Sequence, residues 1–328
     1  MDRQGKHSME HTYSVRSEMR NGVEVFALRD GERASAEVAP ALGNNCFAFA
    51  AVHPVLEAVD FAEFLKKPTS YGMPLLFPFP NRIKDGMFSF QGERYRINPP
   101  RHGFVRDKAW KVLGTGASES EGTWIRSEFR AKDHASEILQ QFPFPFTLEV
   151  TYRLRNGRLE LHALAQNTGA RDMPTGFGIH PYFRRPERGT IQVPAAKRWE
   201  LSGSLPTGKL LDLDAPFDLR QPHDIAGLRL DDIYAQPVAD DSGRVQCFLN
   251  DEVNKVQTVV EFNRREFPHI VVYTPPAPRP AICIEPNTCP TDAFNLQDRG
   301  VDSNVIVFKP GEKAEFNVSV YSRDLKTE

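Results

Sequence analysis

The chain has 328 residues, and its 41 Lys and Arg against 43 Asp and Glu give a formal net charge of −2. This balance argues against a protein that coats nucleic acid, which would carry a basic excess. With 40% hydrophobic and 26% charged residues, the composition is that of a soluble globular protein and excludes wholesale disorder. No apolar run is long enough to span a membrane, and the polar N-terminus has no signal-peptide core.

The first half of the chain is rich in short apolar segments bounded by Gly, Pro, Asn or Asp, which is typical of strands separated by turns. Between two of these segments, Phe61 to Lys67 favours a short helix that Pro68 ends. The predicted strands in this half are 23–28, 36–38, 46–51, 88–90, 95–97, 110–113 and 123–129.

The clearest pattern lies at residues 146–165. Apolar side chains occupy every second position from Phe146 to Leu154 and again from Leu159 to Ala165, with Asn156-Gly157 between the two runs. Strict alternation across an Asn-Gly pair is the strongest short-range signal for a β-hairpin. We therefore predict two antiparallel strands joined by a tight turn.

The second half repeats the same organisation, and the Pro-rich stretch 275–280 is predicted to be a loop between two strands. Short strands at this spacing indicate an all-β fold, a large β-sandwich. No Pro/Gly/Ser linker divides the chain, so we expect a polar tail at 1–20 and a single β-sandwich domain at 21–322. The further predicted strands are 190–193, 256–262, 270–273, 281–284, 305–308 and 314–321.

The four cysteines are widely spaced and form no Cys-x-x-Cys pair. Reduced thiols in a cytoplasmic protein are therefore expected. The four positions are Cys46, Cys247, Cys283 and Cys289.

Two segments in the first half carry polar side chains suited to a binding pocket. Arg82 closely follows the Phe-Pro-Phe-Pro run at 77–80, whose stiff backbone would hold a guanidinium in a fixed position. His102 lies beside Gly103, which permits a ligand or the backbone to approach closely. Taken alone, Arg82 is equally well explained as a surface arginine paired to a carboxylate, and His102 is better explained as a structural histidine.

Two further segments carry groups suited to proton transfer. Pro181 pushes His180 into an extended conformation, and two aromatic residues follow that could wall a small pocket. Glu285 ends the apolar strand 281–284, where burial in a pocket would raise its pKa toward that of a useful base.

The order of these motifs resembles the aldose 1-epimerases, also called galactose mutarotases, over roughly residues 20–322. The motifs are Asn81-Arg82-Ile83 with Gly86, Phe88, Gly92 and Tyr95, then His102-Gly103, the hairpin at 146–165, His180-Pro181-Tyr182-Phe183, Ile284-Glu285-Pro286, and Thr291-Asp292-Ala293-Phe294-Asn295. The resemblance implies a β-supersandwich that interconverts the α and β anomers of a free aldose without a cofactor or metal.

The resemblance also implies residue roles. His180 matches the catalytic acid and Glu285 the catalytic base, whereas Arg82 and His102 match residues that hold the sugar. Asp231 matches a sugar-binding Asp loosely, and its neighbour Asp232 is a rival. At their reference pKa values, of about 6.5 and 4.3, an imidazolium and a carboxylate would deliver and remove the two protons that anomerisation requires. The implied partner is a monosaccharide, with no nucleic acid or membrane, and the chain is expected to be a monomer or weak homodimer.

The sequence departs from the galactose mutarotase pattern near the sugar. Phe104 stands where that branch has a second Gly after His102, and 268–274 lacks the Gln that often precedes Tyr-Thr there. A sister branch acts on hexose 6-phosphates, and several arginines near the motifs could bind a phosphate or lie at the solvated surface. These are Arg101, Arg106, Arg184 and Arg185.

Two other classes of protein stay open on the sequence alone. A non-catalytic carbohydrate-binding module on the same fold would explain the aromatic residues and Arg82, but not the pairing of His180 with Glu285. A metal-dependent enzyme could use His102, His180 and Glu285 as ligands, although the chain lacks His-x-His spacing.

Overall fold

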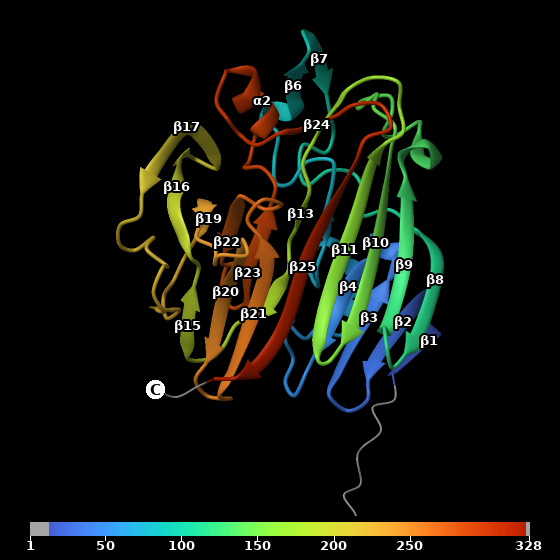
Figure 1. Cartoon of the computed structure of the whole chain (residues 1–328), viewed down its shortest axis with the longest axis vertical. Helices are drawn as coiled ribbons and strands as arrows, with labels where there is room; N and C mark the ends of the chain where they lie inside the picture. Colours follow the sequence, from blue (N-terminus) through green and yellow to red (C-terminus); the bar gives the residue numbers. More distant parts are fainter. Residues whose placement is uncertain (1–12, 326–328) are drawn as a thin grey trace, which may run out of the picture.

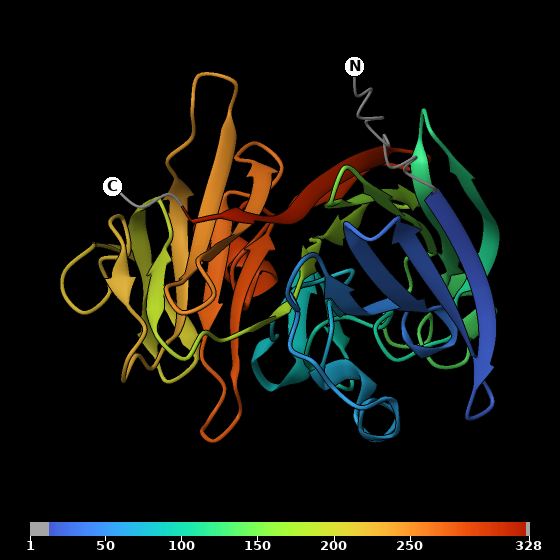
Figure 2. The ribbon, with the colours of Figure 1, turned by 90° about the horizontal axis from the view of Figure 1, so that it is seen from below.

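The computed structural model describes residues 13–325, which form a large β-sandwich (Figures 1 and 2). The longest sheet has nine strands. In spatial order they are β18 (His223–Asp224), β15 (Gly189–Gln192), β20 (Arg244–Asp251), β21 (Val256–Asn263), β25 (Lys313–Asp324), β11 (Arg158–Asn167), β10 (Phe146–Arg155), β9 (Gly122–Arg130) and β8 (Lys111–Ser118).

In the second large sheet, two short strands pair with β23. Its order is β17 (Leu205–Asp212), β16 (Ala195–Ser202), β19 (Asp231–Pro237), β22 (His269–Tyr273), β23 (Ala281–Asn287), β13 (Gly178–Ile179) and β5 (Leu75–Leu76), and β14 (Tyr182–Arg184) also pairs with β23.

Smaller sheets and a few helical turns complete the fold. A four-stranded sheet contains β1 (Tyr13–Arg20), β2 (Val23–Asp30), β3 (Ala34–Ala39) and β4 (Asn45–Ala50). The two-stranded sheets are β12 (Met173–Thr175) with β24 (Ile306–Phe308) and β6 (Met87–Phe90) with β7 (Glu93–Arg96). The helices are α1 (Phe61–Lys66) and α2 (Ala293–Asp298), with 3-10 turns at Pro40–Leu42, Pro68–Ser70, Lys84–Gly86 and Ala131–His134.

Strand β25 joins the two halves of the nine-stranded sheet. It pairs with β11 on one side and with β21 on the other, and Figure 2 shows it crossing between the two groups of strands. The neighbouring hairpin β10–β11 has the alternating burial that its sequence predicts, with Phe146, Leu148, Val150, Tyr152 and Leu154 all inaccessible to solvent. Burial of these side chains provides much of the hydrophobic stabilisation at this end of the core.

The all-β prediction is confirmed, as are the hairpin at 146–165, the loop at 275–280 and the helix that begins at Phe61. The prediction of a tail is wrong for Tyr13–Arg20, which forms β1 and pairs along its length with β2. Only the part of that tail at 1–12 lies outside the described residues. The error has a physical cause, because β1 is half-buried or exposed throughout and has no buried face to produce an apolar alternation.

Several other elements were not predicted, including two strands at one edge of the second large sheet. Strand β16 is mostly half-buried and β17 is mostly half-buried or exposed, so neither shows a clear alternation. Strand β17 also contains Pro206 and Gly208, which normally weaken a strand prediction. Helix α2 has six residues, as α1 has, but no proline follows closely to mark its end. Strands β19 and β20 and the short β5, β12, β13, β14 and β18 were also missed.

Within residues 13–325, all four cysteines are free and buried. No helix in this part of the chain has the length and apolar character needed to cross a bilayer.

His269, at the start of β22, is a neutral structural histidine. Its Nδ1 accepts a hydrogen bond from Nε1 of Trp199 at 3.3 Å, and its Nε2 lies 2.9 Å from Oδ1 of Asn304. An imidazole that accepts at Nδ1 and donates at Nε2 carries a single proton. Burial lowers the pKa of His269 to about 4.

We expect this histidine to make the free energy of unfolding fall as the pH is lowered. The unfolded chain takes up a proton near pH 6.5 and the folded chain does not, so one such group costs about 2 kcal/mol between pH 7 and pH 5. Urea unfolding of wild type and His269→Gln at both pH values measures this loss, which the variant should lack. His162→Gln is the matched control, because the His162 side chain is 43% exposed. An equal pH dependence in all three proteins would contradict the prediction.

Candidate active site

A polar cavity of about 240 Å³ lies against the second large sheet, where loops from the first half of the chain meet β19, β22 and β23. The structure brings Arg82, His102, His180, Asp231 and Glu285 to this one cavity. The other lining residues are Asn81, Arg101, Tyr182, Leu201, Ser204, Ile233, Val271, Tyr273 and Thr291.

His180 and Glu285 face each other because of strand register. Gly178 pairs with Asn287 and Tyr182 pairs with Cys283, so His180 lies midway between two paired positions, opposite Glu285 on β23. Nε2 of His180 is 3.3 Å from Oε1 of Glu285. Over one hundred residues of sequence separate the two groups, yet the ladder fixes their contact.

Burial changes the protonation of both groups. The side chains of His180 and Glu285 are 10% and 2% exposed. Burial, aided by the charge of Arg106, lowers the pKa of His180 to about 3. Burial, aided by the charge of Asp231, raises the pKa of Glu285 well above its usual value. The reference values used for the sequence therefore do not hold here, whereas the expected rise for Glu285 is found.

The consequence is a pair that favours zero net charge. Each group alone resists ionisation in a desolvated site, but a single proton shared between them leaves the pair neutral overall. Such closely coupled groups titrate as a unit, with macroscopic pKa values that belong to the pair. The pair can therefore donate a proton through one group and accept a proton through the other.

Two loop segments bring basic side chains to the cavity. Arg82 and Arg101 form an isolated antiparallel β-bridge, and Phe77 and Gly103 form a parallel one. Between these bridges, His102 adopts a left-handed conformation with φ 62°. The ring of His102 then lies 5.6 Å from that of His180, measured between centroids.

The segment before α2 is hydrogen-bonded to the loop that carries Arg82. The backbone N–H of Asp292 donates to the carbonyl of Arg82 at 2.7 Å, and Oδ1 of Asp292 accepts from the N–H of Lys84 at 2.8 Å. The amide of Asn295 also donates to this oxygen at 2.6 Å. The Thr-Asp-Ala-Phe-Asn motif thus positions an arginine that lies more than two hundred residues earlier.

The two neighbouring aspartates, Asp231 and Asp232, differ in their position relative to the cavity. Asp231 lines the cavity, whereas Asp232 is not among its lining residues. Burial raises the pKa of Asp231, and the charges of Arg82 and Arg101 oppose that rise. Asp231 is thus the carboxylate that faces the basic side of the cavity.

Several buried polar atoms around the cavity have no hydrogen-bond partner within the described part of the chain. Because buried polar groups normally find partners, such a cluster is suited to a ligand rich in hydroxyl groups. The atoms are Nε of Arg82, Nδ1 of His102, Nδ1 of His180 and Oγ1 of Thr291.

A metal-ligand set can also be drawn at this place. Ligand atoms of His180, Cys283 and Glu285 lie within 4.8 Å of one another, and all three residues are buried. Metals bind the thiolate form of cysteine, but burial raises the pKa of Cys283 well above its usual value. The chemistry of this set therefore fits a proton-transfer pair beside a neutral thiol better than a metal centre.

Sequence reasoning indicated one aromatic residue of the cavity, Tyr182, and missed another, Tyr273. The ring of Tyr182 stacks on His180, with 4.5 Å between centroids and 20° between planes, and the ring of Tyr273 lies edge-on to His180. Tyr182 follows His180 by two residues, which places it on the same side of an extended segment. That spacing was a usable signal, whereas nothing in the sequence connects Tyr273 with His180.

Comparison with known proteins gives a family match and a set of structural neighbours. A sequence model of the family described as aldose 1-epimerase matches residues 50–321. YihR of Escherichia coli K12, described as uncharacterized, is 22% identical over 278 residues, covering 78% of this chain and 80% of YihR. A solved galactose mutarotase-like protein from Clostridium acetobutylicum has 21% identity and a TM-score of 0.85, covering 96% of this chain and all of the other. Galactose 1-epimerase from Lactobacillus acidophilus NCFM has 16% identity and a TM-score of 0.76, covering 96% and 99%.

The loop beside His102 provides a test of how the cavity is held together. A Cβ added at Gly103 would lie 1.9 Å from the carbonyl oxygen of Phe77, and its φ is +68°. Gly92 has a similar φ of +82° but open space around it. We expect Gly103→Ala to lower the free energy of unfolding by about 3 kcal/mol, against about 1 kcal/mol for Gly92→Ala. Urea denaturation measures both, and equal losses would mean that the close backbone approach is unimportant.

Proposed function

Because the chain belongs to the aldose 1-epimerase family, we propose that it interconverts the α and β anomers of an aldose, with His180 and Glu285 as the proton-transfer pair. The observation that supports this most is the buried contact of 3.3 Å between the two groups at a polar cavity. A module that only binds sugar has no need of two titratable groups held in this way.

In the proposed reaction, the one proton of the pair, which the raised pKa of Glu285 and the lowered pKa of His180 place on Glu285 in the empty site, first moves to His180. Glu285 as carboxylate then takes the proton of the anomeric hydroxyl while His180 as imidazolium gives a proton to the ring oxygen. The bond from C1 to the ring oxygen breaks, and the electrons of the former O–H bond form the C1 carbonyl. Rotation about C1–C2 then presents the other carbonyl face, and the ring closes with both transfers reversed. The enzyme pair holds one proton before and after each half of the reaction.

The remaining side chains are proposed to orient the sugar. Arg82 and His102 offer hydrogen-bond donors to the sugar hydroxyls. Asp231, which feels the charge of Arg82, offers hydrogen-bond acceptors. The cavity of about 240 Å³ is smaller than the range of about 300–1,000 Å³ usual for drug-sized ligands. Its size and polar lining suit a single monosaccharide unit.

Arg101 supports a second candidate substrate, a hexose 6-phosphate. It lines the cavity next to Arg82, and two adjacent guanidiniums suit a phosphate group. The free cysteines are consistent with a reducing compartment such as the cytoplasm, where either substrate class would be met.

Removing either proton-transfer group should abolish most of the activity. We expect Glu285→Gln and His180→Asn each to lower the rate of mutarotation by about 10²–10⁴-fold, because each group carries one proton transfer. Polarimetry on fresh α-glucose, α-galactose and glucose 6-phosphate measures the rate above the buffer value.

His162→Asn is the matched control, because His162 lies on β11 and is not among the residues that line the cavity. Dialysis against EDTA should leave the wild-type rate unchanged, and loss of activity would instead favour a metal enzyme. Tight sugar binding without any rate enhancement would favour a binding module and contradict the proposal.

The pH dependence follows from the shared proton. Activity requires one proton on the pair, so it is lost when the pair is doubly protonated at low pH and when it is empty at high pH. Because the pKa of His180 is lowered to about 3, the acidic loss should lie well below the ordinary histidine value of about 6.5. A profile of kcat/KM from pH 4 to 9, corrected for buffer catalysis, measures this. A fall centred near pH 6.5 would show that an unperturbed histidine controls the reaction.

A further inference from the structure

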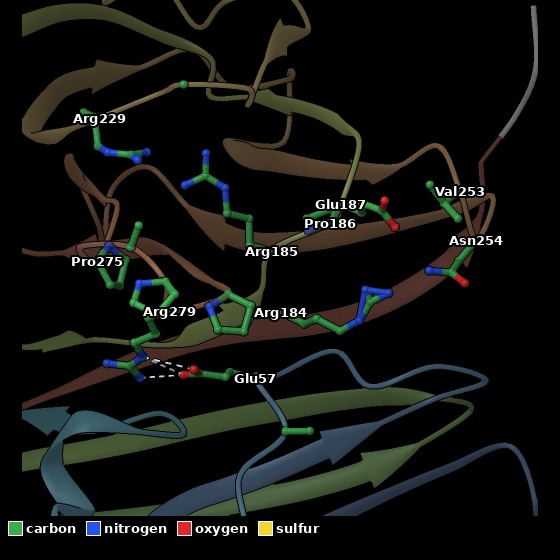
Figure 3. A pocket seen from close by; sticks show the side chains of 15 residues that line it. Glu57, Arg184, Arg185, Pro186, Glu187, Arg229, Val253, Asn254, Pro275 and Arg279 are labelled. Atoms are coloured by element: carbon green, nitrogen blue, oxygen red, sulfur yellow. Dashed lines mark hydrogen bonds and ion pairs between the residues drawn. The ribbon is translucent and has the colours of Figure 1, made fainter.

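A second and larger cavity, of about 590 Å³, shares no lining residue with the first (Figure 3). Loops from five separate parts of the chain form it, namely 57–58, 184–187, 227–229, 253–254 and 275–280. Its volume lies within the range of about 300–1,000 Å³ that is usual for small-molecule sites. The proposed epimerase reaction leaves this cavity without a function.

The cavity is lined by four arginines, of which two are neutralised. Nε of Arg279 donates to both carboxylate oxygens of Glu57, at 3.0 and 2.9 Å, and Figure 3 shows this pair on one wall. Nη2 of Arg184 donates to Oδ2 of Asp251 at 3.0 Å. These two guanidiniums are therefore occupied by carboxylates of the protein itself.

The other two arginines, Arg185 and Arg229, have no carboxylate partner among residues 13–325. Each guanidinium instead donates to a nearby backbone carbonyl, Arg185 to that of Ile225 and Arg229 to that of Leu228. Burial and the neighbouring charge of Arg229 both lower the pKa of Arg185. Two close like charges in a partly desolvated place repel each other, and an anion between them would relieve that repulsion.

The rest of the lining indicates what kind of anion fits. In the view of Figure 3, Arg185 and Arg229 lie at one side of the cavity, whereas Glu187 and Asn254 lie at the other. Glu187 would repel a second negative group but can accept hydrogen bonds from hydroxyls. Prolines at 186, 275, 278 and 280 stiffen the walls between the two sides.

We propose that this cavity binds the phosphate monoester of a small polyhydroxylated molecule, with the phosphate between Arg185 and Arg229 and the hydroxyl groups toward Glu187. Guanidiniums match the oxygens of a phosphate in planar, two-point contacts, which makes arginine pairs a common phosphate site. This site is separate from the proposed epimerase cavity and does not depend on its function.

Glycerol 3-phosphate is a suitable probe, because it has a phosphate and hydroxyls but no sugar ring. We expect saturable binding of one molecule to the full chain by isothermal titration calorimetry, weakening as salt is raised. Arg229→Gln and the double variant Arg185→Gln/Arg229→Gln should weaken it by about tenfold or more for each lost guanidinium. Glycerol alone should show no binding, and weaker binding of inorganic phosphate would show that the hydroxyls contribute.

Three variants serve as controls. Arg188→Gln removes the same charge from a nearby side chain that is 71% exposed and does not line the cavity, so binding should be unchanged. Arg101→Gln and Glu285→Gln alter the first cavity and should also leave binding unchanged, whatever they do to mutarotation. Circular dichroism melting shows whether each variant is folded, and Arg229→Gln alone keeps the test decisive if the double variant unfolds.

No saturable binding to the wild type would overturn the proposal, as would equal binding by folded Arg229→Gln. Loss of binding in Glu285→Gln or Arg101→Gln would place the phosphate in the first cavity and overturn it as well. None of these results depends on whether the chain is an epimerase.

Discussion

The register of two short strands against β23 is the constraint on which the site depends. Gly178 and Tyr182 pair with Asn287 and Cys283, and the interruption between β13 and β14 leaves His180 opposite Glu285 without a ladder bond of its own. The N–H of His180 bonds instead to the carbonyl of Pro74 at 3.0 Å. A shift by one residue would turn one of the two side chains to the other face of the sheet and separate the pair.

The support of this pair extends to the wall of the second cavity. Glu57 holds Arg279, the guanidinium of Arg279 lies 4.2 Å from the ring centroid of Tyr182, and that ring stacks on His180. The N–H of Glu57 also donates to the carbonyl of Tyr182 at 2.9 Å. One face of the imidazole is thus packed against a ring held in place by a partly buried ion pair, which limits the orientations that His180 can adopt.

Alternation and the positions of Gly and Pro allowed prediction of the fold class, because they act locally, whereas the residues that meet at one cavity were predicted from the resemblance of the motif order to the aldose 1-epimerases. The sequence did not reveal Tyr273 or the role of Asp292, because their partners are set by sheet pairing and loop packing far along the chain. It also misjudged the protonation of His180, whose pKa is lowered, whereas a raised pKa for a buried Glu285 was expected. A reference pKa describes a solvated side chain, and only the fold shows that His180 and Glu285 are both almost removed from water.

That removal from water bears directly on how the pair can work. A single buried carboxylate or imidazolium is costly, whereas a pair that exchanges one proton with a neutral sugar keeps the same total charge throughout. Each proton accepted from the sugar by one member is matched by a proton that the other member delivers. The surroundings therefore do not need to reorganise around a new net charge, and the polar groups of Arg82, His102 and Asp231 can remain fixed around the opening ring.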